Sequence, residues 1–307
     1  KVPENWYWDA VRRNVDPEHM LIEAEKNEMT LIRADQVSGV VGACAAISWV
    51  SKPNSSWELI AWRKESLIGS ERIVSPKSVS ELSGRFPGTF LNRDPTKGKG
   101  LIAPRTPCPV LYGIRGSCSS DVERAHNWLQ SRKDVETCQS FGIHRSNQIS
   151  DDHIESIHSG CVTCMPREKR GGHANISVFS AGQSFELVAF SEGGPVNRLL
   201  RKLEPGDRIS WVGLLSPDGS IHLERLRVDS ASPRIVSRPI CCNRTMRSSG
   251  KSQGLRCLSC GSNDRKTWYC TDYDDLNDPP SGIWLEPTPS NRRHLSRPLS
   301  HGLPGTN

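Results

Sequence analysis

The sequence predicts a multidomain protein of the α+β class, and three features of its 307 residues support this prediction. Residues 56–155 alternate strand and helix patterns, residues 156–233 carry short strand patterns, and residues 234–270 are rich in cysteine and basic side chains. A chain of this length usually folds as two or more domains. The hydrophobic content of 35% and the mean hydropathy of −0.52 are low for one large core and fit several small ones.

Composition also narrows the class of protein. The net charge of +6 and the pI near 8.8 permit a polyanionic partner without requiring one. No apolar run of about eighteen residues predicts a membrane span, and the first residues do not resemble a signal peptide. Eleven cysteines, single or in close pairs, favour metal binding in a reducing compartment over disulfides. We therefore expect a cytoplasmic protein without membrane contact, which begins partway into a longer gene product because it lacks an initiator Met.

Two helices are predicted in residues 1–55. Asp16 is a typical N-cap, Pro17 suits the first helical position, and the helix should run to about Lys26. The apolar, small-residue stretch Gly39–Ile47 predicts a helix packed closely on a sheet, with Cys44 in the core.

Residues 56–155 predict a ferredoxin-like α/β sandwich. The alternating stretch Ser56–Trp62 predicts a strand, and Val110–Ile114 predicts a second one. Ser78–Leu82 and Asp121–Ser131 predict the two helices. Two strand–helix passes with polar loops at one edge are typical of that fold.

Two loops of this domain are candidates for a site, and we expect them to be neighbours in space. The first, Pro104–Pro109, contains three prolines, which fix the backbone and leave carbonyl groups free to hold a guanidinium or an amine. A stiff turn before a strand is an equally common interpretation. The second loop follows the short apolar run that begins at Phe141.

This second loop is unusually dense in polar side chains. It supplies a cation, two amides, hydroxyls, two carboxylates and an imidazole, from Arg145, Ser146, Asn147, Gln148, Ser150, Asp151, Asp152 and His153. Such a mixture is what a site needs to bind a polar ligand. The alternative is a helix cap, in which Ser150 or Asp151 begins a helix at Asp152–His158 and Arg145 is solvated. Composition alone leaves both interpretations open.

Residues 156–233 predict an OB-fold. Five strand-like runs follow one another, and a helical stretch that ends at Pro205-Gly206 separates the third from the fourth. Cys161-x-x-Cys164 falls in the first strand, where it is either structural or metal-bound. The helical stretch carries three basic residues that suit phosphates or an ordinary solvated face: Arg198, Arg201 and Lys202.

Residues 234–270 predict a zinc ribbon. Cys257-x-x-Cys260 forms one half of a zinc site, and the adjacent pair Cys241-Cys242 forms the other, with Cys270 as a possible replacement. Basic side chains that favour a phosphate backbone surround them, among them Arg247, Lys251 and Arg256. The tail, residues 271–307, begins with the acidic, Pro-rich stretch Asp272–Pro280, which we expect to be flexible.

Five motifs, in order, resemble one family. PCPVLYGIRG (107–116), HRSNQISDDH (144–153), RGGH (170–173), CNRTMRSSGKSQGLRCLSCG (242–261) and RRHLSRPL (292–299) are similar to those of the archaeal tRNA(Ile) 2-agmatinylcytidine synthetases. The resemblance implies a tRNA-modifying ligase that uses ATP to join agmatine to C2 of the wobble cytidine of CAU-anticodon tRNA(Ile). It also implies ATP, Mg²⁺ and Zn²⁺ as cofactors, and it makes residues 1–55 the C-terminal part of a kinase-like domain.

The resemblance also implies roles for individual residues. It makes Asp151, Asp152 and His153 catalytic, and it assigns the zinc ligands to Cys241, Cys242, Cys257 and Cys260. Substrate binding falls to Pro107, Cys108, Pro109, Gly113, Arg115, Arg145, Ser146, Asn147 and Gln148. The tRNA-binding residues are Arg198, Arg201, Lys202, Arg247, Lys251 and Arg256.

Four features depart from the family pattern. Ile149 stands where the family usually has Gly, Cys108 stands where many members have Asp, and Cys241-Cys242 replaces a C-x-x-C pair. The Asp-rich segment that binds Mg²⁺ and ATP phosphates in the family has no counterpart here. We therefore expect a fragment that binds tRNA but does not turn over alone.

The alternative is a non-catalytic RNA- or single-strand-binding module built from the OB-fold and the zinc ribbon. Asp151 and Asp152 favour the ligase, because two carboxylates beside an anionic ligand repel it unless a metal or a cationic substrate lies between.

Overall fold

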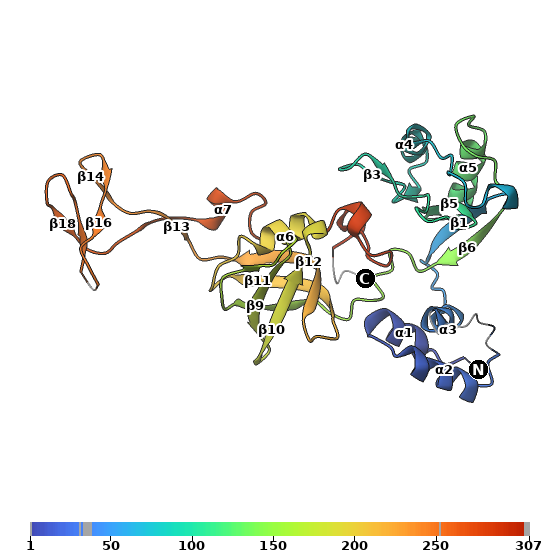
Figure 1. Ribbon diagram of the computed structural model, residues 1–307, viewed down its shortest axis with the longest axis horizontal. Helices are drawn as coiled ribbons and strands as arrows, with labels where there is room; N and C mark the ends of the chain where they lie inside the picture. Colours follow the sequence, from blue (N-terminus) through green and yellow to red (C-terminus); the bar gives the residue numbers. More distant parts are fainter. Residues whose placement is uncertain (1, 31, 33–38, 252, 304–307) are drawn as a thin grey trace.

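The computed structural model describes residues 2–30, 32, 39–251 and 253–303. It is elongated, with a small helical unit beside a sheet unit, a central barrel, and a small β-unit at the end of a long arm (Figure 1). These units make the mixed α+β fold that the sequence predicts. None of the described helices is long and apolar enough to cross a membrane.

The helical unit consists of α1 (Asn5–Arg12), α2 (Pro17–Lys26) and α3 (Val40–Ser48). The helix predicted from Pro17 is confirmed, and the Asp16 side chain caps it by accepting a hydrogen bond from the Glu18 amide. The buried face of α3 packs with α1 and α2, around Trp6, Met20, Ala24, Val40 and Cys44. The expectation that this helix packs on a sheet is therefore wrong. Residues 1, 31 and 33–38 of the predicted kinase-like part lie outside the described residues.

The sheet unit has four antiparallel strands in the order β2-β5-β1-β6. Their bounds are Thr89–Phe90 for β2, Val110–Gly116 for β5, Ser56–Trp62 for β1 and Ser140–Ser146 for β6. The helices α4 (Pro76–Arg85) and α5 (Ser119–Gln130) pack on one face, around a core that includes Leu59, Leu82, Ile114 and Leu129. The remaining elements are η1 (Glu65–Leu67) and the hairpin of β3 (Arg93–Asp94) and β4 (Lys99–Gly100).

The register of this sheet separates the two candidate loops. Val110, which follows the Pro-rich loop, lies opposite Trp62 at one end of β1. Ser146, where the polar loop begins, lies opposite Ser56 at the other end. Six residue steps along a strand span about 20 Å. The expectation that the two loops are neighbours is therefore wrong. Both β5 and β6 pair antiparallel with β1, so the start of β5 and the end of β6 lie at opposite ends of β1.

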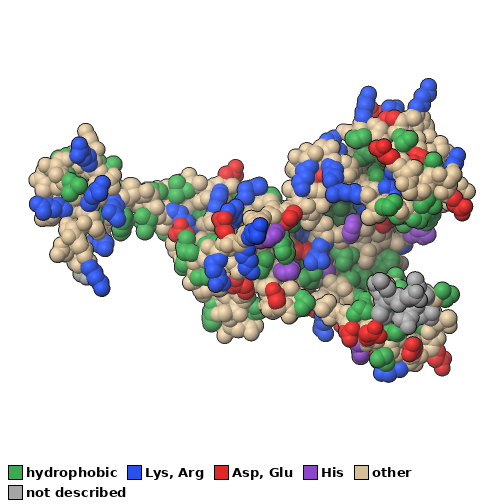
Figure 2. Space-filling model, viewed as in Figure 1, with side chains coloured by type: hydrophobic (Ala, Val, Ile, Leu, Met, Phe, Trp, Pro, Cys, Tyr) green, Lys and Arg blue, Asp and Glu red, His purple; other side chains and the backbone are tan. Residues whose placement is uncertain are grey.

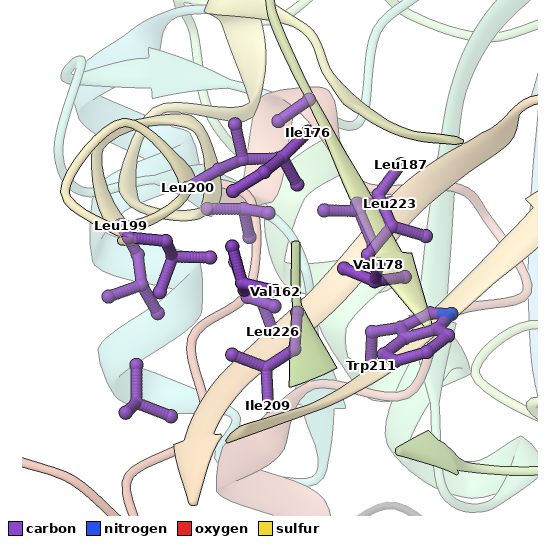
Figure 3. Packing of buried hydrophobic residues seen from close by; sticks show 14 of the residues in the cluster. Val162, Ile176, Val178, Leu187, Leu199, Leu200, Ile209, Trp211, Leu223 and Leu226 are labelled. Atoms are coloured by element: carbon purple, nitrogen blue, oxygen red, sulfur yellow. The ribbon is translucent and has the colours of Figure 1, made fainter. Parts of the chain in front are cut away.

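The barrel confirms the five predicted strands. These are β7 (His158–Val162), β9 (Ala174–Ser180), β10 (Gln183–Ala189), β11 (Arg208–Leu215) and β12 (Ile221–Ser230). They close in the order β7-β9-β10-β12-β11-β7, with α6 (Pro195–Leu200) inserted between β10 and β11. Figure 3 shows the core, in which Trp211, Leu187 and Leu226 from three strands face Leu200 of α6. The short elements β8 (Arg167–Glu168) and η2 (Ser191–Gly193) border it.

The unit at the end of the arm, residues 238–268, is small, and we call it the knob. The arm pairs β13 (Arg234–Ser237) with β19 (Tyr269–Thr271). The knob holds two small sheets, whose strands are β14 (Ile240–Cys241), β15 (Arg244–Thr245), β16 (Arg247–Ser248), β17 (Leu255–Arg256) and β18 (Asn263–Asp264). Its buried core is limited to Met246, Leu255 and Cys257, with Cys241 beside them.

The predicted flexible stretch Asp272–Pro280 is instead packed on the barrel. It contains α7 (Tyr273–Leu276), and the Tyr273 ring belongs to the barrel core. Leu285 then forms a β-bridge with Leu226. The rest of the tail, with η3 (Pro289–Asn291) and η4 (Leu299–His301), runs back toward the sheet unit (Figure 1). Residues 304–307 of the predicted tail lie outside the described residues.

Candidate functional site

A cavity of about 620 Å³ lies where the helical unit, the sheet unit and the C-terminal segment meet. The helical unit and the linker after it supply aromatic and cationic walls, the polar loop supplies one side, and the tail supplies another cation. The lining includes Trp8, Arg12, Trp49, Lys52, Phe90, Ser117, Ser146, Gln148, Ile149, Asp151, Asp152, Arg297 and His301. A polar loop with aromatic neighbours in a cavity of this volume suits a small polar ligand.

Asp152 links the polar loop to the helical unit and the linker after it through hydrogen bonds. Its side chain accepts hydrogen bonds from the Tyr7 hydroxyl at 2.8 Å and the Lys52 ammonium at 3.0 Å. Arg12 donates to the Asp152 backbone carbonyl at 2.9 Å. Burial raises the pKa of the Tyr7 phenol, so the phenol stays a donor to the carboxylate.

Asp151 is bound to the barrel rather than free in the cavity. The Arg225 guanidinium donates two hydrogen bonds to its carboxylate, at 2.7 and 3.1 Å, and this guanidinium lies on a side chain that is 2% exposed. The Arg297 amide donates a third at 2.7 Å. A bidentate pair with a buried Arg is the strongest form of charge-assisted hydrogen bond.

His153 is buried against another barrel residue. Its Nε2 lies 2.6 Å from the Glu224 carboxylate, which also accepts a hydrogen bond from the Ser296 hydroxyl at 2.6 Å and pairs with Arg293. Burial would raise the pKa of Glu224, but the hydrogen bond and charge of His153, with Ser296 and Arg293, hold it below its ordinary value.

These contacts correct two sequence expectations. Asp151 and Asp152 each have an internal cation, so they need no metal or cationic substrate to offset them, and the argument that they exclude a plain binding module is wrong. The helix-cap alternative is also wrong, because residues 152–157 form turns and coil. The predicted catalytic residues Asp151, Asp152 and His153 hold the loop in place.

Three of the four loop residues predicted to bind substrate are also engaged by the protein itself. The Arg145 guanidinium lies 4.2 Å from the Trp57 ring centroid and donates to the backbone carbonyl of Ser55. Ser146 is buried, with its hydroxyl 3.5 Å from Glu58. Asn147 donates to the Tyr7 hydroxyl at 3.2 Å.

Gln148 differs from its neighbours. Its side chain lines the cavity, and its buried Oε1 accepts no hydrogen bond from any residue that the structure describes. A buried amide oxygen without a partner costs about 1–3 kcal/mol, so such an atom marks a place where a ligand can supply the missing donor. His153 Nδ1 is also buried without a partner among the described residues, but His153 does not line this cavity. Gln148 is therefore the predicted site residue that combines a place in the cavity lining with an unpaired buried atom.

Ile149 shows why the family usually has Gly at this position. Its φ of +55° lies in the left-handed region, which a β-branched residue rarely adopts. The backbone geometry that suits Gly is thus kept with a bulkier residue. Its amide donates to the His294 carbonyl at 3.1 Å, which holds the loop against the tail.

The Pro-rich loop holds a guanidinium, as its geometry predicts, but the guanidinium is internal. Arg72 donates to the backbone carbonyls of Pro104 at 2.5 Å, Thr106 at 3.0 Å and Cys108 at 3.1 Å. Burial opposes ionisation of the Cys108 thiol, but hydrogen bonds involving Val110 and Thr106 and the Arg72 charge lower its pKa overall. Pro107, Cys108 and Pro109 do not line the cavity described above.

Gly113 and Arg115 lie on β5, between the two loops. Arg115 donates to the Glu58 carboxylate at 3.0 Å, and Gly113 lies over the same carboxylate, where a Cβ would approach Glu58 Oε1 to 3.1 Å. Both residues contact Glu58, whose carboxylate also lies near Ser146 of the polar loop, and neither residue lines the cavity.

The four predicted zinc ligands come together. The sulfur atoms of Cys241, Cys242, Cys257 and Cys260 lie within 4.8 Å of one another, and Cys241 Sγ is 3.6 Å from Cys260 Sγ and 3.9 Å from Cys242 Sγ. Tetrahedral zinc with bonds of about 2.3 Å sets ligands about 3.8 Å apart, so the cluster fits this metal. The adjacent pair can reach one ion because Cys242 and the next residue, Asn243, both take left-handed conformations, with φ of +50° and +57°.

The electrostatics of the cluster also favour a cation. Thiolates at Cys260 and Cys257 raise the pKa of Cys241 to about 12, whereas backbone amides of Cys260 and Ser259 lower the pKa of Cys257 to about 6. Four sulfur atoms this close ionise together only if a positive ion offsets their charges. Neither Cys270 nor Cys161-x-x-Cys164 belongs to a possible metal group among the described residues.

The predicted tRNA-binding residues are on the surface of two separate units. Arg198, Arg201 and Lys202 are exposed at α6, where Arg201 pairs with Glu168. Arg247 and Arg256 lie opposite each other on β16 and β17, with Lys251 at the turn between these strands. Figure 2 shows basic side chains over the knob and over this part of the barrel.

Sequence reasoning missed the partners of the polar loop. Tyr7, Lys52, Glu224 and Arg225 lie far from it in sequence and belong to no motif that predicts a site. One signal was present, because Glu224 and Arg225 are adjacent charged residues inside a strand pattern. Arg72, which fills the Pro-rich loop, has no such signal.

Three comparisons identify the family. A model described as the TiaS FLD domain matches residues 38–153. The isoleucine-tRNA 2-agmatinylcytidine synthetase TiaS of Methanopyrus kandleri is 32% identical over 328 residues, which cover 97% of this chain and 73% of that protein. A solved complex of TiaS with its isoleucine tRNA and ATP is 26% identical with a TM-score of 0.79, and it covers 99% of this chain and 74% of its own.

A second solved structure, a complex of TiaS with the same tRNA, AMPCPP and agmatine, is 25% identical with a TM-score of 0.76 and the same coverage of both chains, 99% and 74%. The resemblance seen in the motifs is confirmed, and so is the mixed α+β fold with its five-stranded barrel. The chain belongs to the isoleucine-tRNA 2-agmatinylcytidine synthetase family, a family of ligases.

Proposed function

We propose that this chain joins agmatine to C2 of the wobble cytidine of CAU-anticodon tRNA(Ile), with ATP as the activating co-substrate, and that the cavity beside Gln148 receives the reacting base. The observation that carries the proposal is Gln148, which lines a cavity of about 620 Å³ and whose buried Oε1 has no hydrogen-bond partner among the described residues. The relatives support it by their names, and two solved relatives hold the isoleucine tRNA with ATP or with AMPCPP and agmatine.

The cavity wall suits a base that has left its stack. Trp8 and Trp49 line it, and aromatic faces stabilise an unstacked base. The Gln148 amide can accept from the exocyclic amine of a cytosine and donate to its ring edge. The cations Arg12, Lys52 and Arg297 suit the anionic groups that accompany the base.

The chemistry explains why ATP is needed. The C2 oxygen of cytosine is a poor leaving group, and transfer of phosphate or nucleotide to that oxygen makes it a good one. The primary amine of agmatine then forms a bond to C2, the activated oxygen leaves with its phosphate, and the amine loses a proton. Among the described residues, the four cysteines are the group of three or more His, Cys, Asp or Glu side chains that could hold a metal ion. We therefore assign Mg²⁺ to no residue.

We also propose the domain assignment. The strand order β2-β5-β1-β6 with two helices on one face supports a ferredoxin-like domain at 56–155, and the closed five-stranded barrel with α6 supports an OB-fold at 156–233. The four-cysteine cluster supports a zinc ribbon at 234–270. The helices of residues 1–55 are proposed to be part of the kinase-like domain, and residues 271–307 the tail.

The basic surfaces of the barrel and the knob are proposed to hold the tRNA. Arg198 and Lys202 at α6 and Arg247, Lys251 and Arg256 on the knob are exposed, which leaves them available to phosphates. Zinc would order the knob, because its apolar core is too small to fix five short strands by itself.

The test measures incorporation of radiolabelled agmatine into two tRNAs in the presence of ATP. The proposal predicts incorporation into CAU-anticodon tRNA(Ile) and none into elongator methionine tRNA. Preferred binding of tRNA(Ile) without incorporation would instead support the sequence expectation of a fragment that binds tRNA but does not turn over alone. Binding of both tRNAs is measured in parallel at two salt concentrations. No incorporation, together with equal and steeply salt-dependent binding of both tRNAs, would support the alternative of a plain nucleic-acid-binding module.

A further inference from the structure

We propose that Glu224 and Arg225 of the barrel are positioning residues for the polar loop 146–153. Through this loop they fix the position of the cavity wall relative to the barrel. The role of the cavity rests on the proposed function, whereas the link itself rests on the contacts alone. In the part of the chain that the structure describes, Arg225 pairs with Asp151 and Glu224 pairs with His153, so two barrel residues hold both ends of a three-residue stretch.

A β-bulge directs these two side chains toward the loop. In the pairing of β11 with β12, Val212 lies opposite Arg225 and Gly213 lies opposite Leu223, so Glu224 is the extra residue. A bulge changes the direction of side chains that would otherwise alternate, and here two consecutive charged residues are both buried. Gly213 permits the close approach, because a Cβ at this position would lie 2.5 Å from the His222 carbonyl oxygen.

The tail completes the link between the two units. Arg225 donates to the Arg297 carbonyl at 2.6 Å, and Ser296 donates to Glu224 at 2.6 Å. The amides of Ile149 and Asp151 in turn donate to the carbonyls of His294 and Leu295, at 3.1 and 2.9 Å. The loop, the tail and the bulged strand are therefore joined by one set of hydrogen bonds.

This set of hydrogen bonds joins the proposed tRNA-holding unit to the wall that carries Gln148. A displacement of about 1 Å at a reacting centre can cost on the order of 100-fold in rate. We therefore expect the pairs Glu224–His153 and Arg225–Asp151 to affect the rate of turnover and the mobility of the polar loop. These pairs lie outside the basic surfaces proposed to hold the tRNA. Asp151 and His153 act in it as positioning residues rather than as catalytic ones.

The test is hydrogen exchange of the whole chain, comparing the parent with Arg225→Lys, Asp151→Asn and the double variant. Each single variant removes the bidentate pair and should increase exchange at the amides of residues 147–153 at least tenfold, while amides of the barrel core are unchanged. The double variant should exchange no faster than either single variant, because both remove one interaction.

Arg234→Lys is the matched control. It removes a buried bidentate pair with Asp207, and the hydrogen bonds and ion pairs of Arg234 with described residues go to the barrel and the start of its arm rather than to the loop. It should leave exchange at 147–153 unchanged even if the barrel is less stable. Unchanged exchange in Arg225→Lys, or additive effects in the double variant, would overturn the positioning role. Because exchange requires no substrate, that result stays separate from any failure of agmatine incorporation, which would count against the proposed function alone.

Discussion

The Pro-rich loop and the polar loop of the sheet unit are both candidate sites in the sequence, but they differ in where their unsatisfied buried groups lie. At one end of the sheet, the carbonyls of Pro104–Pro109 are occupied by Arg72. At the other end, the carboxylates of Asp151 and Asp152 are occupied by Arg225 and Lys52, but Gln148 Oε1 has no partner among the described residues. The comparison teaches that an abundance of polar groups does not mark a site. A buried group without a partner indicates a site only where its residue borders a cavity, because Arg72 Nε also has no partner among the described residues and Arg72 does not line the cavity described above.

The largest effect is expected at the carboxylate that joins the polar loop to the helical unit. Asp152→Ala should lower the free energy of unfolding by about 2–3 kcal/mol, because it leaves the buried Tyr7 hydroxyl and the Lys52 ammonium unpaired. Denaturant unfolding followed by Trp fluorescence would report it, since Trp8 and Trp49 lie beside the junction. Asp9→Ala, which removes a partly exposed carboxylate of α1, is the control and should change stability by less than about 0.5 kcal/mol.

The next effect is expected in the other loop. Arg72→Met keeps much of the side-chain volume but leaves three carbonyls without their donor, which should cost about 1–2 kcal/mol. Ligand binding in the cavity should not change, because the loop lies at the opposite end of the strands. Loss of agmatine binding in Arg72→Met, without loss of stability, would instead show that this loop is the ligand site.

How far the sequence carries this account depends on the range of the interactions. Local patterns predicted α2, the strands of the barrel and the four cysteines, because caps, alternation and ligand spacing are properties of neighbouring residues. The partners of the polar loop could not be predicted, since Arg225 and Lys52 reach it only through the tertiary fold. The contact of Tyr273 with the barrel core could not be predicted for the same reason, since the residues around it are acidic and its partners lie far away in the sequence.

A smaller effect is expected from backbone strain. Ile149→Gly should stabilise the chain by about 0.5 kcal/mol, because relief of the left-handed strain slightly exceeds the entropy cost of Gly and the lost side chain. Ile154→Gly is the matched control, since Ile154 is also half-buried but is not among the residues with positive φ. It should destabilise by about 1 kcal/mol or more. Thermal unfolding compares the two, and equal losses would show that the φ of Ile149 carries no strain.

The sharpest effect on function is expected at a residue whose replacement should not destabilise the chain. Gln148→Leu should raise the free energy of unfolding by about 1 kcal/mol, because it removes a buried Oε1 that has no hydrogen-bond partner among the described residues. Gln148→Glu, which keeps the shape and the acceptor but adds charge, is the companion variant. Chemical denaturation measures the free energy of unfolding of both variants before any binding measurement.

The most direct test of the account is equilibrium binding of radiolabelled agmatine in the presence of CAU-anticodon tRNA(Ile) and AMPCPP, for the parent, Gln148→Leu and Arg72→Met. The agmatine amine must meet C2 of a base held beside Gln148. If the cavity receives that base, Gln148→Leu should therefore weaken agmatine binding about tenfold or more, and Arg72→Met should bind like the parent. Parent-like binding by Gln148→Leu together with weakened binding by Arg72→Met would contradict it and move the site to the Pro-rich loop.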